Sequence, residues 1–85
     1  MRNLEFDPHA LEDLAWWIKN DRKKALKIIK LVEFIQKDPF KGIGEPEPLK
    51  YELAGAWLRH INKEHRIVYQ VFDDKIRILS CRYHY

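Results

Sequence analysis

The segment AWLRHINKEHRIVYQVFDDKIRILSCRY, residues 56–83, decides the fold class that we predict for this chain. It contains three runs in which apolar and polar residues alternate, at 56–62, 65–72 and 75–83, and these runs are rich in β-branched and aromatic residues. Such a pattern is typical of β-strands that bury one face. The connectors between the runs, Lys-Glu and Asp-Asp, are short enough for antiparallel hairpins.

The N-terminal half predicts a short strand followed by two helices. Residues 2–6 read as the strand, and they precede Asp7, a suitable N-cap, and Pro8, which fits the first helical position. The first helix is expected to run to about Asn20. Its expected apolar stripe consists of Leu11, Leu14, Ala15 and Ile18. The corresponding stripe of the second helix consists of Ala25, Ile28, Ile29, Val32 and Ile35.

Residues 38–48 separate the helices from the strands. This segment contains three prolines and two glycines, so it cannot continue a helix and is expected to form a stiffened loop. The predicted order of elements is therefore β-α-α-β-β-β. It indicates an α+β fold, in which two N-terminal helices pack on one face of a twisted antiparallel sheet. Residues 1–85 are expected to form a single domain.

The composition narrows the class of protein. The single cysteine excludes an intramolecular disulfide, which fits a reducing compartment. No apolar stretch reaches the roughly 18 residues of a membrane span, and acidic residues stand where a signal peptide needs an apolar region. We therefore expect a cytoplasmic protein with no membrane partner. The net charge of +3 favours a polyanion as partner, although mild basicity also serves solubility.

Basic residues recur along the predicted strands. By alternation, one sheet face is expected to present Arg59, Arg66, Arg82 and His84 together, with the helices on the other face. A guanidinium group matches a phosphate in two hydrogen bonds and stays charged at neutral pH, so this face is a candidate RNA-binding surface. Three aromatic residues could stack on unpaired bases, namely Trp57, Tyr83 and Tyr85, and for Trp57 the alternative of packing in the core is favoured.

Two further residues could transfer protons. Glu47 lies between Pro46 and Pro48, which restrict the backbone around its carboxylate, and Glu45 could raise its proton affinity by like-charge repulsion. His84 could act as an acid near neutral pH. Alternation turns Cys81 toward the core, and the other histidines are interpreted as surface or turn residues.

These residues together suit the cleavage of RNA without a metal ion or cofactor. Glu47 would remove the proton of a ribose 2′-OH, and Arg66 would stabilise the charge on the attacked phosphate. His84 would protonate the leaving 5′-oxygen, and Tyr85 adds an aromatic hydroxyl. No Cys/His pair at ligand spacing and no Gly-rich phosphate loop is recognisable in the sequence.

Three motifs in this order resemble one family. They are GEPEPLK at 44–50, EHRIVY at 64–69 and CRYHY at 81–85. The chain resembles the YoeB (Txe) toxins of bacterial type II toxin–antitoxin systems, within the RelE superfamily, over essentially its whole length. The resemblance implies a compact microbial-RNase-like fold and an mRNA endonuclease that acts in the ribosomal A site. It also implies a YefM-like antitoxin as partner, and a homodimer remains open.

The resemblance assigns the same roles to Glu47, Arg66 and His84, and it implies that Tyr85 helps to hold the substrate base or phosphate. It assigns contacts with RNA phosphate to Lys50 and Arg59. His60 replaces an arginine that is common in the family, and Glu45 adds an acidic group near the site. Two alternatives remain open: a non-catalytic RNA- or ribosome-binding module, and a nuclease that cuts free RNA.

Overall fold

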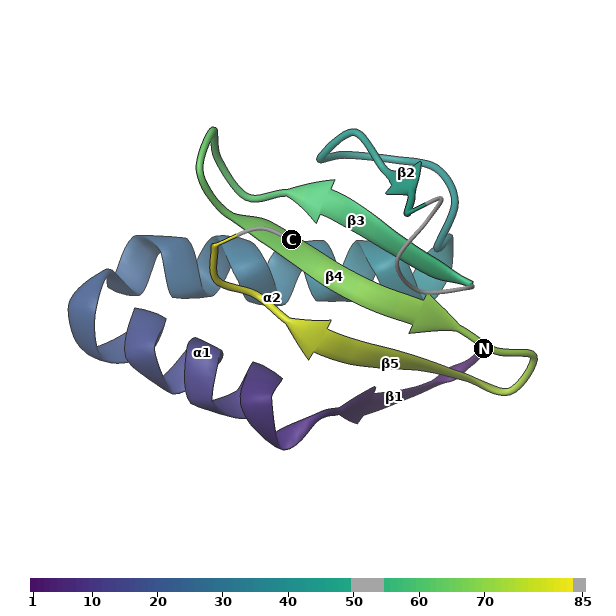
Figure 1. Cartoon of the computed structure of the whole chain (residues 1–85), viewed down its shortest axis with the longest axis horizontal. Coiled ribbons are helices and arrows are strands. Elements are labelled where there is room, and N and C mark those ends of the chain that lie inside the picture. The colour runs from purple at the N-terminus through teal and green to yellow at the C-terminus, as the bar shows by residue number, and fades with distance from the viewer. Residues whose placement is uncertain (50–54, 84–85) are drawn as a thin grey trace.

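The computed structural model describes residues 1–49 and 55–83, and it confirms an α+β fold (Figure 1). The elements follow in the order β1 (Asn3–Phe6), α1 (Pro8–Asn20), α2 (Arg22–Lys37), β2 (Glu47–Pro48), β3 (Ala56–His60), β4 (Arg66–Val71) and β5 (Lys75–Ser80). Among the described residues, no helix combines the length and the apolar character needed to cross a membrane.

The five strands form one sheet in the order β1-β5-β4-β3-β2. Strands β3 to β5 pair in antiparallel fashion, as expected. The prediction that residues 38–48 form only a loop is wrong at its end, because Glu47 and Pro48 form the short strand β2, which pairs antiparallel with β3. Strand β1 instead runs parallel to β5, with Leu4 opposite Ile76, so the sheet is mixed rather than wholly antiparallel. Strands β1 and β5 are separated in the sequence by both helices and three strands, so no hairpin constrains them to pair in antiparallel fashion.

Strand β5 contacts β1 through charged side chains and ends earlier than predicted. Glu5 of β1 accepts a hydrogen bond from Arg77 at 2.5 Å and lies 3.4 Å from the Lys75 ammonium. The prediction that the last strand extends to Tyr83 is wrong, because β5 ends at Ser80. At Cys81 and Tyr83, the backbone bonds with side chains of α1 and of the β3–β4 turn, and one backbone bond, from the Arg66 N–H to the Tyr83 carbonyl, still links this segment to β4.

Helix α1 begins as predicted but buries a different face. The Asp7 side chain accepts the His9 N–H at 2.9 Å, and Pro8 takes the first helical position. The buried residues are Ala10, Asp13 and Trp17. Of the expected stripe, Leu14 packs partly on the core, whereas Leu11 and Ile18 are each 54% exposed. The large Trp17 ring and the bonded Asp13 carboxylate therefore set the rotation of the helix.

Helix α2 follows its predicted stripe more closely. The Asp21 side chain caps it by accepting the Lys24 N–H at 3.2 Å. Four residues of the expected stripe are buried, but Ile29 is exposed and Leu31 is buried in its place. Both helices and the sheet contribute to one hydrophobic core, which includes Ile67, Ile76 and Ile78 of the strands. The helices therefore cover one face of the sheet, and the other face is available for a site.

Candidate functional site

Glu47, His60 and Arg66 lie on one face of three neighbouring strands. Glu47 of β2 pairs with Leu58 of β3, and His60, two residues further along β3, pairs with Arg66 of β4. Residues directly opposite each other, and residues two apart in a strand, share a face of the sheet. The Nε2 atom of His60 lies 3.7 Å from Oε1 of Glu47. The sheet thus brings the predicted base and the predicted phosphate-binding arginine together.

The loop before β2 is held closely against β3. The His60 N–H donates to the Gly44 carbonyl at 2.7 Å. Gly44 has φ +86°, and a Cβ added there would lie 3.2 Å from both the His60 carbonyl oxygen and Cβ of Arg59. Glu45 also adopts a positive φ of 52°, which is uncommon for a residue with a side chain. Its carboxylate lies 3.8 Å from His60 Nε2, so two carboxylates flank this ring.

The guanidinium group of Arg66 is held by uncharged acceptors. Its Nη1 donates to the carbonyls of Lys63 at 3.1 Å and Asn62 at 3.4 Å, both in the β3–β4 turn. Within residues 1–49 and 55–83, no carboxylate forms an ion pair with Arg66. Its positive charge is therefore oriented by the turn and not neutralised by those residues, which suits an anionic ligand.

A pocket of about 440 Å³ adjoins His60. Lys27, Glu45, His60 and Lys63 contribute to its wall. The Lys27 ammonium donates to the Ile61 carbonyl at 2.5 Å, so α2 supplies a cation to the edge of the sheet. The pocket thus places two lysines beside the face that carries Glu47 and Arg66. Sequence reasoning did not single out Lys27 or Lys63, because only the packing of α2 and the β3–β4 turn brings them to this place.

The prediction that Arg59 lies on the exposed, RNA-binding face is wrong. Arg59 is 0% exposed. Its Nε donates to the Tyr69 hydroxyl at 3.2 Å, and its two terminal nitrogens donate to the carbonyls of Asp38, Lys41 and Ile43. Arg59 pairs with Ile67 and therefore shares the helix-facing side, whereas His60 shares the face of Arg66. Its charge anchors the loop after α2 to the sheet.

Tyr69 completes this anchor. Its hydroxyl donates to the Pro39 carbonyl at 2.7 Å. Burial raises the pKa of Tyr69, although the neighbouring Arg59 acts in the opposite direction, so the hydroxyl remains a protonated donor. Trp57 packs against the core and against Phe40, with ring centroids 5.1 Å apart, so it has the packing role considered for it.

Arg82 also departs from its predicted place. Its guanidinium carbon lies 3.6 Å from the ring centroid of Trp16 and 4.7 Å from that of Tyr83, and its Nη2 donates to the Tyr83 hydroxyl at 2.9 Å. The group is therefore stacked against α1 and does not share the face of Arg66, because β5 has already ended. A contact between Arg82 and RNA stays a prediction.

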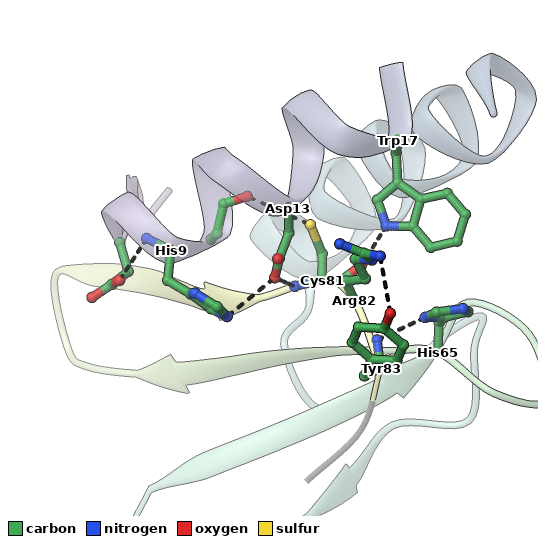
Figure 2. Close-up of polar contacts among 9 residues, drawn as sticks. His9, Asp13, Trp17, His65, Cys81, Arg82 and Tyr83 are labelled. Carbon is green, nitrogen blue, oxygen red and sulfur yellow. Dashed lines mark hydrogen bonds and ion pairs between the residues drawn. The ribbon is translucent and has the colours of Figure 1, made fainter. Parts of the chain in front are cut away.

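The segment after β5 is bound on both sides, as Figure 2 shows. The Cys81 N–H donates to Asp13 at 3.0 Å, and the Cys81 carbonyl accepts from the Trp17 indole at 2.7 Å. Tyr83 then donates its N–H to Nδ1 of His65 at 2.7 Å. Its carbonyl accepts the Arg66 N–H at 2.8 Å. Side chains of α1 and the turn before β4 thus direct this segment to Arg66.

Cys81 lies in the core, as predicted, with 0% exposure. Burial raises the pKa of its thiol to about 12 from an ordinary value of 9.0, and the nearby Asp13 carboxylate contributes to the rise. A thiol that stays protonated is a poor nucleophile. The arrangement therefore favours a structural role for Cys81.

The buried thiol predicts that stability declines in alkaline solution. Below pH 9, Cys81 is protonated in both the folded and the unfolded chain. Between pH 9 and about pH 12, only the unfolded chain loses the proton, so the free energy of unfolding falls by about 1.4 kcal/mol per pH unit from this residue. Urea titrations of the wild type and Cys81→Ala, which lacks the group, check this: the wild type's advantage should shrink above pH 9, and a constant advantage would contradict the prediction.

Three predicted site residues, Lys50, His84 and Tyr85, lie outside the described residues. Sequence reasoning also missed two histidines that it interpreted as surface or turn residues. His60 lies between the carboxylates of Glu45 and Glu47, and His65 binds the backbone of Tyr83. The strand register could have indicated His60, whereas no local signal points to the contact of His65 with a residue 18 positions away.

The arrangement combines a carboxylate that can accept a proton with fixed positive charge on one surface. In the part of the chain that the structure describes, no three His, Cys, Asp or Glu side chains gather as a set of metal ligands. The chemistry that these residues can supply themselves is proton transfer and stabilisation of an anion.

The sequence and the structure were compared with those of known proteins, and both are similar to one family of bacterial toxins. Residues 6–85 match the family described as YoeB-like toxin of bacterial type II toxin–antitoxin systems. Toxin YoeB of Mycobacterium bovis is 53% identical over 85 residues, which cover 100% of both chains. The YoeB dimer from Staphylococcus aureus superimposes with a TM-score of 0.89 at 46% identity, covering 99% of this chain and 98% of that chain. A heterotetrameric YoeB–YefM complex from the same species gives 0.87 at 45% identity, covering 100% and 99%.

Proposed function

The chain belongs to the YoeB-like toxins of bacterial type II toxin–antitoxin systems, and from this we propose that it is a ribosome-dependent endoribonuclease that cleaves mRNA in the ribosomal A site. The observation that carries the proposal is the shared face of Glu47 and Arg66. A base and a guanidinium group on one surface are two of the groups that an attack of a ribose 2′-OH on its own phosphate uses. Cleavage would stop translation.

In the proposed reaction, the Glu47 carboxylate takes the proton of the 2′-OH. The 2′-oxygen forms a bond to the adjacent phosphorus, and the bond from phosphorus to the 5′-oxygen breaks. Arg66 stabilises the negative charge that develops on the phosphate, and His84 gives a proton to the leaving 5′-oxygen. The products are a 2′,3′-cyclic phosphate and a 5′-hydroxyl end. The protein's own side chains supply every proton transfer in this scheme, and no cofactor takes part.

The residues that bind the substrate follow from the charges near the site. Lys27 and Lys63 at the pocket beside His60 are placed to contact phosphates, and we assign the same role to Lys50. Tyr85 would hold the substrate base or phosphate. Arg59 is not part of this set, because its guanidinium is buried.

We extend the proposal to a YefM-like antitoxin that neutralises the toxin and to a homodimer of this chain. The complex of a Staphylococcus aureus relative with YefM supports the first, and the dimer of the relative from that species supports the second. Activity on translating ribosomes implies a cytoplasmic protein.

The cleavage test uses 70S ribosomes programmed with a defined mRNA. We expect the purified protein to cut the A-site codon and to leave a cyclic phosphate. A 2′-deoxy nucleotide on the 5′ side of the cut removes the nucleophile and should reduce cleavage at that position by at least about 10³-fold, because the chemistry loses its attacking group. The same deoxy substitution three nucleotides upstream is the matched control and should leave the rate unchanged.

The alternatives give different results in this assay. If the deoxy mRNA is cut at the normal rate, the 2′-OH mechanism is wrong. A non-catalytic ribosome-binding module would bind, with strong dependence on salt, and release no fragment. A nuclease that acts on free RNA would cut the same mRNA without ribosomes.

A further inference from the structure

We propose that His65 is a positioning residue for the proposed RNA cleavage, because its imidazole holds the backbone of Tyr83 next to Arg66. The inference rests on the proposed function but concerns a residue outside the catalytic set. Both polar backbone groups of Tyr83 bind neighbouring residues: the N–H donates to His65 Nδ1 at 2.7 Å, and the carbonyl accepts the Arg66 N–H at 2.8 Å. That carbonyl carbon is bonded to the nitrogen of His84, the proposed acid.

The backbone at Tyr83 would not be expected to adopt this geometry unaided. Its φ is 62°, in the left-handed region that is uncommon for a residue with a bulky side chain. Such a conformation persists only where the surrounding contacts impose it. The bonds to His65 and Arg66 are contacts of this kind, and the Arg82 guanidinium over the Tyr83 ring is a third. Tyr83 is therefore held in one particular orientation.

Contacts other than the one with Tyr83 also hold His65 in place. The Asn62 side chain accepts the His65 N–H at 2.8 Å and the Glu64 N–H at 2.9 Å, which shapes the β3–β4 turn. The imidazole meets the Trp17 ring edge to face, with centroids 4.8 Å apart and planes at 83°. Trp17 in turn donates its indole N–H to the Cys81 carbonyl. Figure 2 shows Trp17 and His65 next to the segment that leads from Cys81 to Tyr83.

The direction of the hydrogen bond defines the tautomer of His65. Nδ1 accepts a backbone N–H, so it carries a lone pair, and the ring proton resides on Nε2. An asparagine can place its Oδ1 close to the position of Nδ1 and accept the same bond. A phenylalanine keeps the aromatic contact with Trp17 but has no acceptor. The two substitutions therefore separate the hydrogen bond from the packing of the ring.

The test measures single-turnover cleavage on programmed ribosomes for the wild type, His65→Phe and His65→Asn. We expect His65→Phe to lower the cleavage rate constant by about 10- to 100-fold while the half-saturating ribosome concentration stays within about twofold, because a small misplacement of a reacting group slows chemistry more than binding. His65→Asn should recover most of the rate. Thermal melts of both variants show whether each is folded.

A second measurement does not depend on activity. The ¹⁵N shifts of the His65 ring should report the Nε2–H tautomer in the wild type, and the amide hydrogen of Tyr83 should exchange faster in His65→Phe than in His65→Asn. The inference fails if folded His65→Phe cleaves at the wild-type rate, if both variants lose the same activity, or if the ring carries its proton on Nδ1. If the wild type itself cuts no mRNA, the proposed function fails, and the role of His65 in it falls too.

Discussion

Replacing Glu47 by Gln is expected to reduce cleavage of A-site mRNA by about 10²- to 10⁴-fold, the usual contribution of a general base. Glutamine has nearly the same size and can still form hydrogen bonds, but its amide cannot take the proton of the 2′-OH. Binding to the ribosome should change little, because the lost step is chemical. Single-turnover cleavage and ribosome binding, measured on the same preparation, check the two parts of this prediction.

Glu45→Gln is the matched control for this variant. Glu45 lies in the same loop, and its carboxylate is as close to His60 Nε2 as that of Glu47, at 3.8 Å against 3.7 Å. If Glu47 acts as the base, Glu45→Gln should keep the rate within a few-fold, or raise it slightly, because a negative charge near the phosphate is removed. Equal losses in the two variants would assign the effect to the charge around His60, and full activity of Glu47→Gln would remove Glu47 from the catalytic set.

The second large effect concerns stability. Replacing the buried Arg59 by Leu should lower the free energy of unfolding by about 3–5 kcal/mol, because it leaves the loop carbonyls and the Tyr69 hydroxyl without their shared donor. For a small domain with a total stability of about 5–15 kcal/mol, this is a large fraction. Urea denaturation followed by tryptophan fluorescence measures the change.

Arg77→Ala serves as the comparison for Arg59→Leu. Arg77 also binds a partner, Glu5, but the pair lies at the surface, where an ion pair contributes about 0–1 kcal/mol. A small loss at Arg77 and a large one at Arg59 would confirm the buried anchor. If Arg59→Leu instead unfolds like the wild type and binds RNA less tightly, the result would support the contact between Arg59 and RNA phosphate that was predicted from the sequence.

The strands and helices could largely be predicted from local patterns, and the rotation of α1 could not. Alternation located β3, β4 and β5, and the Asp7-Pro8 pair located the start of α1. The buried face of α1 depends on tertiary partners. Asp13 is buried because its carboxylate accepts the Cys81 N–H, and a periodicity that counts only apolar residues leaves such a residue outside the stripe.

Part of the candidate site could also be predicted from the sequence, and part could not. Glu47 and Arg66 could be predicted as a pair, and the structure places them on one face. The side of the sheet on which Arg59 lies depends on the register between β3 and β4, and alternation within one strand leaves that register open. The contact of His65 with Tyr83 depends on where β5 ends. The sequence at 81–83 continues the strand pattern, so it does not indicate that the strand ends at Ser80.

The parallel edge of the sheet bears on how the protein is made. Strand β5 lies between β4 and β1, so residues 3–6 have no strand to pair with until residues 75–80 have been synthesised. During translation, residues 3–6 are made long before their partner, and the sheet closes at this edge only after residues 75–80 emerge from the ribosomal tunnel. Contacts of such long sequence separation form late and slow folding. The pairing of β1 with β5 therefore waits until residues 75–80 have left the tunnel.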